Sequence, residues 1–209
     1  MASEINFDHI RKYFAGKLDT YGTTPRGVDW NSEVSQDVRF EQLSHVINPT
    51  QPYSLLDYGS GFGSMYDFLL NKSHHLTYIG FDIVENMVIK GRELHPSDAN
   101  CTFTNQENEL KPADYAVASG IFNIRLDCEY EVWTDYVVKT LTRMHELSTK
   151  GFSFNLLTKY SDPEYMRPDL YYADPLFFFD YCKRHFSRNV ALLHDYGVYD
   201  FTILVRKDI

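Results

Sequence analysis

The stretch "SLLDYGSGFGSMYDFLL", residues 54–70, runs from a short apolar strand pattern through a glycine-rich turn into a helical pattern. Gly59, Gly61 and Gly63 stand at alternate positions of that turn. A strand that enters a helix through glycines brings backbone N–H groups and the positive end of a helix close to a ligand, because no Cβ atom intervenes. The stretch therefore predicts a site for a nucleotide-like ligand.

The spacing of the glycines bears on which nucleotide binds. A dinucleotide fingerprint reads G-x-G-x-x-G, whereas residues 59–63 read G-x-G-x-G, and Ser64 stands where the third glycine would fall. A nicotinamide-dependent oxidoreductase is therefore the less favoured alternative. Asp82 closes the next predicted strand, where a carboxylate can accept hydrogen bonds from both hydroxyls of a ribose. The other interpretation is a tight βα turn, with Asp82 as the N-cap of the following helix.

Short strands and helices alternate from residue 53 onward. The predicted strands are 53–59, 76–82, 101–106, 113–123, 151–157, 189–196 and 199–207, and the predicted helices are 62–72, 84–94, 130–147 and 177–186. Gly151 is expected to end the helix at 130–147, and a Pro- and Tyr-rich loop follows the strand at 151–157. This alternation predicts an α/β fold with a mostly parallel sheet that helices cover on both faces.

The domain organisation expected from these patterns is a single domain over residues 1–209. Phe7, Ile10, Phe14 and Leu18 fall at helical spacing, and a second helical pattern follows Ser32. Residues 1–50 are therefore predicted to form a helical cover, and residues 51–209 a Rossmann-like core. No repeat or Gly/Ser/Pro linker divides the chain, and its 44% apolar and 16% aromatic content suffices for one core.

Composition argues against several classes of partner. A net charge of −9 without a basic stripe disfavours nucleic acid. No run approaches the roughly 18 apolar residues of a membrane span, and the first residues are too charged for a secretory signal, so no membrane partner and a cytoplasmic location are expected. Cys101, Cys128 and Cys182 lack metal-ligand spacing, so reduced thiols and no metal site are expected.

Three stretches carry a resemblance to a known family: "LLDYGSGFG" (55–63), "YIGFDIVENMV" (78–88) and "ADYAVASGIFN" (113–123). They resemble the first, second and fourth motifs of the class I S-adenosylmethionine-dependent methyltransferases. The similarity covers about residues 53–160, and residues 189–207 are similar to the last two strands of that fold. The resemblance implies a seven-stranded sheet of order 3-2-1-4-5-7-6 with only strand 7 antiparallel. It also implies methyl transfer with S-adenosylmethionine as cofactor.

The resemblance also assigns cofactor contacts. Asp57 would orient the glycine turn and face the methionine amino group, and Ile83 would pack on adenine beside the ribose-binding Asp82. Gln106, or Asn105, stands where the family often has an acidic residue near the adenine amine. The backbone contacts to the methionine, ribose and sulfonium would come from Gly59, Ser60, Gly61, Gly63, Ser119 and Gly120.

The acceptor side is predicted from the carboxyl ends of the strands, where ligands lie in parallel sheets. Methyl transfer mainly requires alignment of the acceptor and exclusion of water. Asn123 and His194 are the candidate catalytic residues. His194, beside Asp195, is the best candidate base, and the alternative is a half-buried strand residue.

Aromatic side chains are the candidate substrate contacts. Tyr160, Tyr171, Tyr172 and Tyr196 could stack on a ring or bond hydroxyls, or they could simply pack over the sheet. Trp30 and Arg39 would cap the methionine end, where Trp30 would meet the substrate and Arg39 would pair the carboxylate. The alternative for Arg39 is a solvated surface charge.

The function expected from all these features is methylation of an oxygen or nitrogen of a small-molecule metabolite. Residues 121–123, "IFN", lack the Asn/Asp-Pro-Pro-aromatic signature of nucleobase methylation, which disfavours nucleobase acceptors. The alternative is a non-catalytic, methyltransferase-like partner subunit. The oligomeric state is left open.

Overall fold

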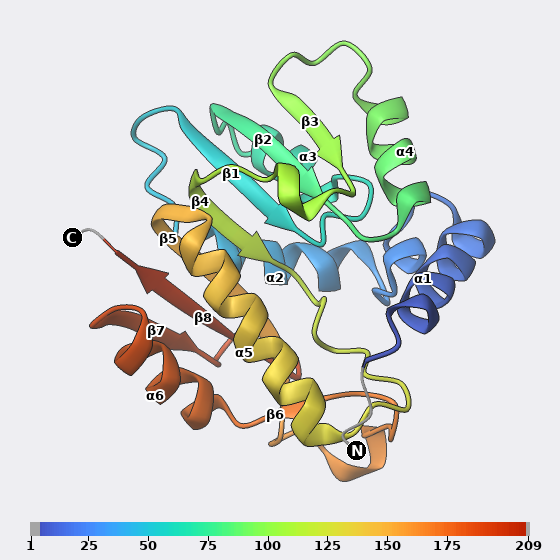
Figure 1. The fold of residues 1–209 in the computed structure, drawn as a ribbon, viewed down its shortest axis with the longest axis vertical. Coiled ribbons are helices and arrows are strands. Elements are labelled where there is room, and N and C mark those ends of the chain that lie inside the picture. The colour runs from blue at the N-terminus through green and yellow to red at the C-terminus, as the bar shows by residue number, and fades with distance from the viewer. Residues whose placement is uncertain (1–4, 208–209) are drawn as a thin grey trace.

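The computed structural model describes residues 5–207 and contains an eight-stranded sheet. Its strands are β1 (Tyr53–Tyr58), β2 (Leu76–Phe81), β3 (Cys101–Thr104), β4 (Ala113–Ala118), β5 (Ser148–Thr158), β6 (Tyr172–Ala173), β7 (Asn189–Leu193) and β8 (Asp200–Arg206). The order is β3-β2-β1-β4-β5-β8-β7, and the two-residue β6 pairs with β5 (Figure 1). β8 runs antiparallel to both of its neighbours, β5 and β7, and the other strand pairs are parallel. The predicted order and direction are confirmed, and β6 is an addition.

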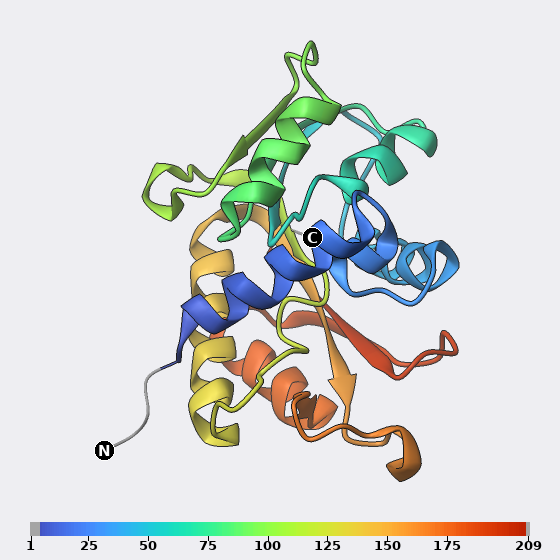
Figure 2. The ribbon, with the colours of Figure 1, turned by 90° about the vertical axis from the view of Figure 1, so that its right-hand side faces the viewer.

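Helices cover both faces of this sheet, and one helix lies beside the carboxyl ends of its parallel strands (Figures 1 and 2). They are α1 (Phe7–Tyr21), α2 (Glu33–Ser44), α3 (Ser64–Asn71), α4 (Glu85–Leu94), α5 (Tyr130–Glu146) and α6 (Pro175–His185), with short 3-10 turns η1 (Pro25–Val28), η2 (Glu107–Glu109) and η3 (Pro163–Tyr165). Helices α5 and α6 pack on one face, and α2, α3 and α4 pack on the other. Helix α1 lies on the side toward which the parallel strands point (Figures 1 and 2). None of these helices is long and apolar enough to cross a bilayer.

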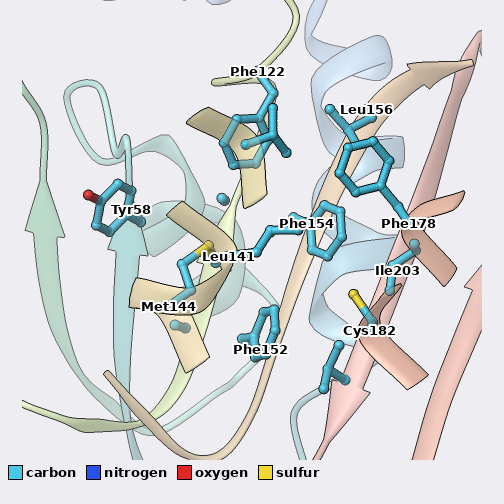
Figure 3. Packing of buried hydrophobic residues seen from close by; sticks show 14 of the residues in the cluster. Tyr58, Phe122, Leu141, Met144, Phe152, Phe154, Leu156, Phe178, Cys182 and Ile203 are labelled. Atoms are coloured by element: carbon cyan, nitrogen blue, oxygen red, sulfur yellow. The ribbon is translucent and has the colours of Figure 1, made fainter. Parts of the chain in front are cut away.

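The larger core lies between the sheet and the pair α5 and α6 (Figure 3). Phe152, Phe154 and Leu156 alternate along β5 and are fully buried on this side. Helix α5 contributes Leu141 and Met144, which are three residues apart and therefore share its buried face. Because β5 is covered on both faces and paired at both edges, it holds the two halves of the sheet together.

Gly151 does not end the long helix, contrary to the sequence-based expectation. Helix α5 ends at Glu146, and Gly151 lies inside β5, paired with Arg206 of β8. A Cβ atom there would lie 2.6 Å from the carbonyl oxygen of Val205 and 3.2 Å from a methyl group of Val46. The glycine therefore allows β8 and the segment after α2 to approach β5 closely.

Gly16 lies inside α1, and replacing it tests whether residues 7–21 form this helix. It is exposed, and nothing lies within 4 Å of the position a Cβ would take. Gly16→Ala is expected to stabilise the protein by about 0.5–1 kcal/mol, because glycine loses more backbone entropy in a helix than alanine. Urea unfolding of the two proteins measures the difference.

Gly22→Ala is the matched control in the same helix. Gly22 ends α1 with φ 61° and ψ −157°, a conformation open essentially to glycine alone, and it too has nothing within 4 Å of a Cβ position. This variant is expected to lower stability. A gain at Gly22, or a loss at Gly16, would contradict the described course of α1.

Candidate functional site

The glycine turn between β1 and α3 is folded back onto β2. The backbone N–H groups of Gly59 and Ser60 both donate to the carbonyl oxygen of Phe81, at 2.7 and 2.9 Å. Gly59, Gly61 and Gly63 have φ values of 87°, 55° and 99°, which side chains rarely permit. The three glycines therefore maintain a turn that leaves its backbone accessible at the carboxyl edge of the sheet.

Asp82 holds this turn against the start of α4. Its Oδ2 accepts a hydrogen bond from the N–H of Gly61 at 2.8 Å, and its Oδ1 accepts one from the N–H of Val84 at 2.8 Å. Val84 is the N-cap of α4, so the N-cap role that the alternative interpretation gave to Asp82 is wrong. Asp82 instead bonds the N–H of this cap residue and lies beside the turn. Burial raises the pKa of Asp82 to about 6, against the effect of these two hydrogen bonds. The lone pairs that remain on the carboxylate can accept further donors.

Asp57, at the end of β1, is the second buried carboxyl of the site. The hydroxyl of Tyr78 donates to its Oδ2 at 2.7 Å. Burial raises the pKa of Asp57 to about 7, the Tyr78 hydrogen bond lowers it, and the charge of Asp82 raises it further. Two adjacent carboxyls that titrate near neutrality attract positive charge and hydrogen-bond donors.

A cavity of about 260 Å³ opens above these groups, between the carboxyl edge of the sheet and the N-terminal helices. The structure brings most of the predicted site residues to it. Those that line it are Trp30, Arg39, Asp57, Gly59, Ser60, Gly61, Asp82, Ile83, Ser119, Gly120 and Asn123. They come from five separate segments of the chain, which lie together only in the folded protein.

Arg39 and Trp30 form one wall of this cavity. The guanidinium carbon of Arg39 lies 4.4 Å from the centroid of the Trp30 ring. Nη1 donates to the backbone oxygen and the hydroxyl of Ser35, at 2.6 and 2.7 Å. Nε is buried and has no hydrogen-bond partner within residues 5–207. Arg39 is therefore a buried cation in the wall of the cavity, and the solvated-charge alternative is wrong.

Two predicted cofactor residues do not line the cavity. Gly63 caps the start of α3 and points toward Phe103, whose ring would lie 2.7 Å from an added Cβ. Gln106 is exposed beyond β3, where its amide donates to Asn105 at 3.0 Å. The chain turns outward into η2 at this point, so neither amide reaches the cavity.

His194 is not brought to the cavity either, which corrects its prediction as a base. It follows β7 and is exposed, with its ring 6.2 Å from that of Tyr160. The rule that ligands lie at carboxyl ends of strands places His194 at the correct edge. However, β7 is the last strand of the sheet, so its end lies far from the ends of β1 and β4.

The four predicted tyrosine contacts also lie outside the cavity. Tyr171 is fully buried, and its hydroxyl bonds that of Thr134 at 2.8 Å. The Tyr172 hydroxyl accepts from the backbone N–H of Arg167, and Tyr160 is 60% exposed. Tyr196 bonds the hydroxyl of Thr202 at 2.8 Å. These rings pack, or stabilise the loop between β5 and α6, as the alternative interpretation held.

Sequence reasoning missed a set of apolar and aromatic residues that we call the apolar side of the cavity: Phe7, Ile10, Phe14, Ile121, Ile124, Trp133, Tyr136, Leu157 and Leu170. The rings of Phe7 and Trp133 both contact that of Tyr136, at centroid distances of 5.4 and 5.0 Å. Burial raises the pKa of Tyr136 to about 12, which keeps its hydroxyl protonated. The apolar residues of α1 and α5 recur at helical spacing, which indicates a buried helix face. This spacing does not distinguish a face that lines a ligand cavity from one that packs in the core.

No group of three or more His, Cys, Asp or Glu side chains within the described residues could hold a metal ion. The polar groups of the cavity are instead the two carboxyls, the Arg39 guanidinium, the turn backbone and Asn123. Oδ1 of Asn123 already accepts the N–H of Leu157 at 3.2 Å, which orients the side chain. This arrangement suits an organic ligand with hydroxyl and cationic groups at one end.

Comparisons with known proteins agree with this geometry. No family model matches the chain. A protein of Mycobacterium tuberculosis named "Putative methyltransferase Rv1506c" is 46% identical over 162 residues, which are 78% of this chain and 98% of that protein.

Solved structures show the same architecture at low sequence identity. The 1,6-didemethyltoxoflavin-N1-methyltransferase of Burkholderia thailandensis, with bound 1,6-didemethyltoxoflavin and S-adenosylhomocysteine, matches with a TM-score of 0.68 and 18% identity over 100% of this chain and 92% of that one. A complex described as DhpI-SAM-HEP matches with a TM-score of 0.66 and 12% identity over 99% and 100% of the two chains. At these identities the likeness concerns the fold.

Proposed function

Because the chain belongs to the class I S-adenosylmethionine-dependent methyltransferases, we propose that it transfers the methyl group to an oxygen or nitrogen of a small molecule. S-adenosylmethionine is the methyl donor. One observation supports the small-molecule acceptor most directly: the cavity that contains the glycine turn and Asp82 continues into the apolar side beneath α1. An acceptor that shares this cavity with the donor, beneath α1, has to be a compact molecule.

The cofactor is proposed to lie along the turn with its ribose on Asp82. The free lone pairs of that carboxylate would accept the ribose hydroxyls, and Ile83 would pack on the adenine. Asp57 would face the methionine ammonium, and the Arg39 cation in the cavity wall would attract the methionine carboxylate. Ser119 and Gly120, which follow β4, would then flank the sulfonium.

The acceptor is proposed to occupy the apolar side of the cavity. Phe7, Trp133 and Tyr136 offer ring faces and edges against which a planar molecule can stack. The Burkholderia relative is named for methylation at a nitrogen of a small heterocycle, which fits such a chamber. Asn123 and the protonated hydroxyl of Tyr136 would orient the acceptor. A nitrogen with a free lone pair needs no base, so alignment and exclusion of water suffice.

Calorimetric titration and methyl transfer test this function in two steps. Titration with S-adenosylmethionine, S-adenosylhomocysteine and NAD is expected to show binding of the two sulfur nucleosides only. Incubation with methyl-labelled cofactor and a panel of phenols, amines and heterocycles is then expected to label a small product. Label transferred only to added protein or nucleic acid would overturn the small-molecule proposal and leave cofactor binding intact.

Cofactor affinity is expected to fall as the pH is lowered from 8 to 5. In the free protein the pKa of Asp57 is raised to about 7 and that of Asp82 to about 6, so both carboxyls take up protons in this range. Ribose hydroxyls and an ammonium group favour the ionised forms, so binding must release the protons. Each released proton costs up to about tenfold in affinity per pH unit. Titration with S-adenosylhomocysteine at four pH values measures the slope.

The Asp57→Asn variant is the control for this pH dependence. It removes the carboxyl with the higher pKa and is expected to shift the fall in affinity toward lower pH. A flat profile in the parent protein between pH 8 and 5 would show that neither carboxyl meets the cofactor.

A further inference from the structure

Strands β5 and β8 carry a buried polar stripe that packing alone does not explain. Strands covered on both faces are normally apolar throughout, because a buried polar group costs free energy unless it is hydrogen-bonded. Ser153, Asn155, Asp200 and Thr202 are nevertheless all fully buried. Asn155 pairs with Thr202 across the two strands, and Ser153 with Leu204, so the stripe faces α2.

Asn155 and Asp200 are joined to Arg39 in a continuous line of hydrogen bonds, which we call the buried polar chain. Nη2 of Arg39 donates to Oδ2 of Asp200 at 2.5 Å. Nδ2 of Asn155 donates to Oδ1 of the same carboxylate at 2.8 Å. The carboxylate is thus bonded on both oxygens, with one cation and one neutral donor.

The other end of this chain reaches the backbone at the cavity. Oδ1 of Asn155 accepts the N–H of Gly120 at 2.8 Å. Gly120 has φ 71°, and an added Cβ would lie 2.4 Å from the indole of Trp30. The same indole stacks on the guanidinium of Arg39. Trp30 therefore lies between the two ends of the buried polar chain.

We propose that Asn155 and Asp200 are positioning residues that place Gly120, Trp30 and Arg39 around the amino-acid end of the bound cofactor. This inference rests on the proposed placement of the cofactor. Ser35 fixes Nη1 and Asp200 fixes Nη2, so these two residues hold the guanidinium of Arg39 in one orientation in the cavity wall. Without the charge of Asp200, the guanidinium loses its anionic partner and turns to other acceptors, so the cation is no longer held in place for a ligand carboxylate.

Two nucleosides that differ only at this end provide the test. S-adenosylhomocysteine has the amino-acid tail, and 5′-deoxy-5′-methylthioadenosine lacks it. Asp200→Asn keeps the shape and removes the charge. It is expected to weaken S-adenosylhomocysteine binding roughly tenfold to a hundredfold, the scale of a charge-assisted hydrogen bond. Binding of methylthioadenosine is expected to change by less than about threefold.

A second variant and a matched control separate this role from general stability. Asn155→Ala breaks the chain without leaving a buried charge unpaired, and it is expected to weaken only S-adenosylhomocysteine, by about threefold to tenfold. Thr202→Val removes a buried hydroxyl from the same stripe, where its partner is Tyr196 rather than the chain. It is expected to leave the affinity ratio of the two nucleosides unchanged.

The outcomes distinguish this inference from the function on which it rests. Equal losses for both nucleosides, or no loss for either, in folded Asp200→Asn and Asn155→Ala would overturn the positioning role while cofactor binding by the parent protein stands. If the parent protein binds neither nucleoside, the proposed cofactor placement fails, and the positioning role with it.

Discussion

Replacing Asp82 with alanine is expected to weaken S-adenosylhomocysteine binding by about 1.5–3 kcal/mol, the usual contribution of hydrogen bonds to a charged group. The carboxylate would lose the ribose hydroxyls, and the turn would also lose the 2.8 Å bond that Gly61 donates to it. Both losses act at the same end of the cavity, so the effect belongs in the upper part of this range. Calorimetric titration of the two proteins measures it.

Asp114→Ala is the matched control for this variant. Asp114 accepts the backbone N–H of Ser54 at 2.9 Å, so its removal also costs a backbone contact. It lies near the beginning of β4, at the edge of the sheet opposite the cavity. Its loss is expected to leave nucleoside affinity unchanged. Unaltered affinity in Asp82→Ala would refute the placement of the ribose.

Gly120→Ala is expected to reduce cofactor affinity by more than tenfold, about 1.4 kcal/mol, and to lower stability as well. A side chain at φ 71° costs about 1–3 kcal/mol of backbone strain. The added Cβ would also lie 2.4 Å from the rigid indole of Trp30. Since Trp30 cannot yield without leaving Arg39, the cavity wall moves with it. Thermal unfolding and nucleoside titration measure the two effects.

Gly197→Ala separates strain from displacement of the indole. Gly197 has a similar φ of 73° in the turn before β8, and nothing lies within 4 Å of a Cβ there. This variant is expected to lose stability to a comparable extent and to keep its affinity for S-adenosylhomocysteine. Equal affinities for the Gly120 and Gly197 variants would show that Trp30 does not shape the cofactor end.

The fold could be predicted because its signals are local. Each βα unit can be recognised in the sequence because the period of its hydrophobic residues changes from two in the strand to about 3.6 in the helix. The glycine turn marks the junction between the strand and the helix of the first unit. The fold prediction was wrong where a contact distant in sequence decides the role of a residue. Gly151 looks like a helix stop, but it is needed because β8, more than fifty residues later, packs against it.

The two sides of the cavity differed in how far the sequence revealed them. The turn and Asp82 lie in short, continuous motifs whose backbone geometry fixes their place. The apolar side is assembled from α1, α5, the end of β5 and the segments after β4 and β5, and no spacing in the chain relates these to one another. Tyr171 was predicted to contact the substrate, but it is fully buried. The sequence cannot distinguish these roles, because a tyrosine in a loop can pack in the core as well as contact a ligand.

The position of α1 affects how acceptor choice can diverge among related proteins. Phe7, Ile10 and Phe14 line the proposed acceptor side of the cavity, and all three come from one uninterrupted segment. None of the three belongs to the turn or to the strands that we propose hold the nucleoside. We expect that exchanging residues 7–14 between relatives changes which molecules are methylated while the affinity for the donor is retained. Substrate range and donor binding can thus evolve along separate stretches of one gene.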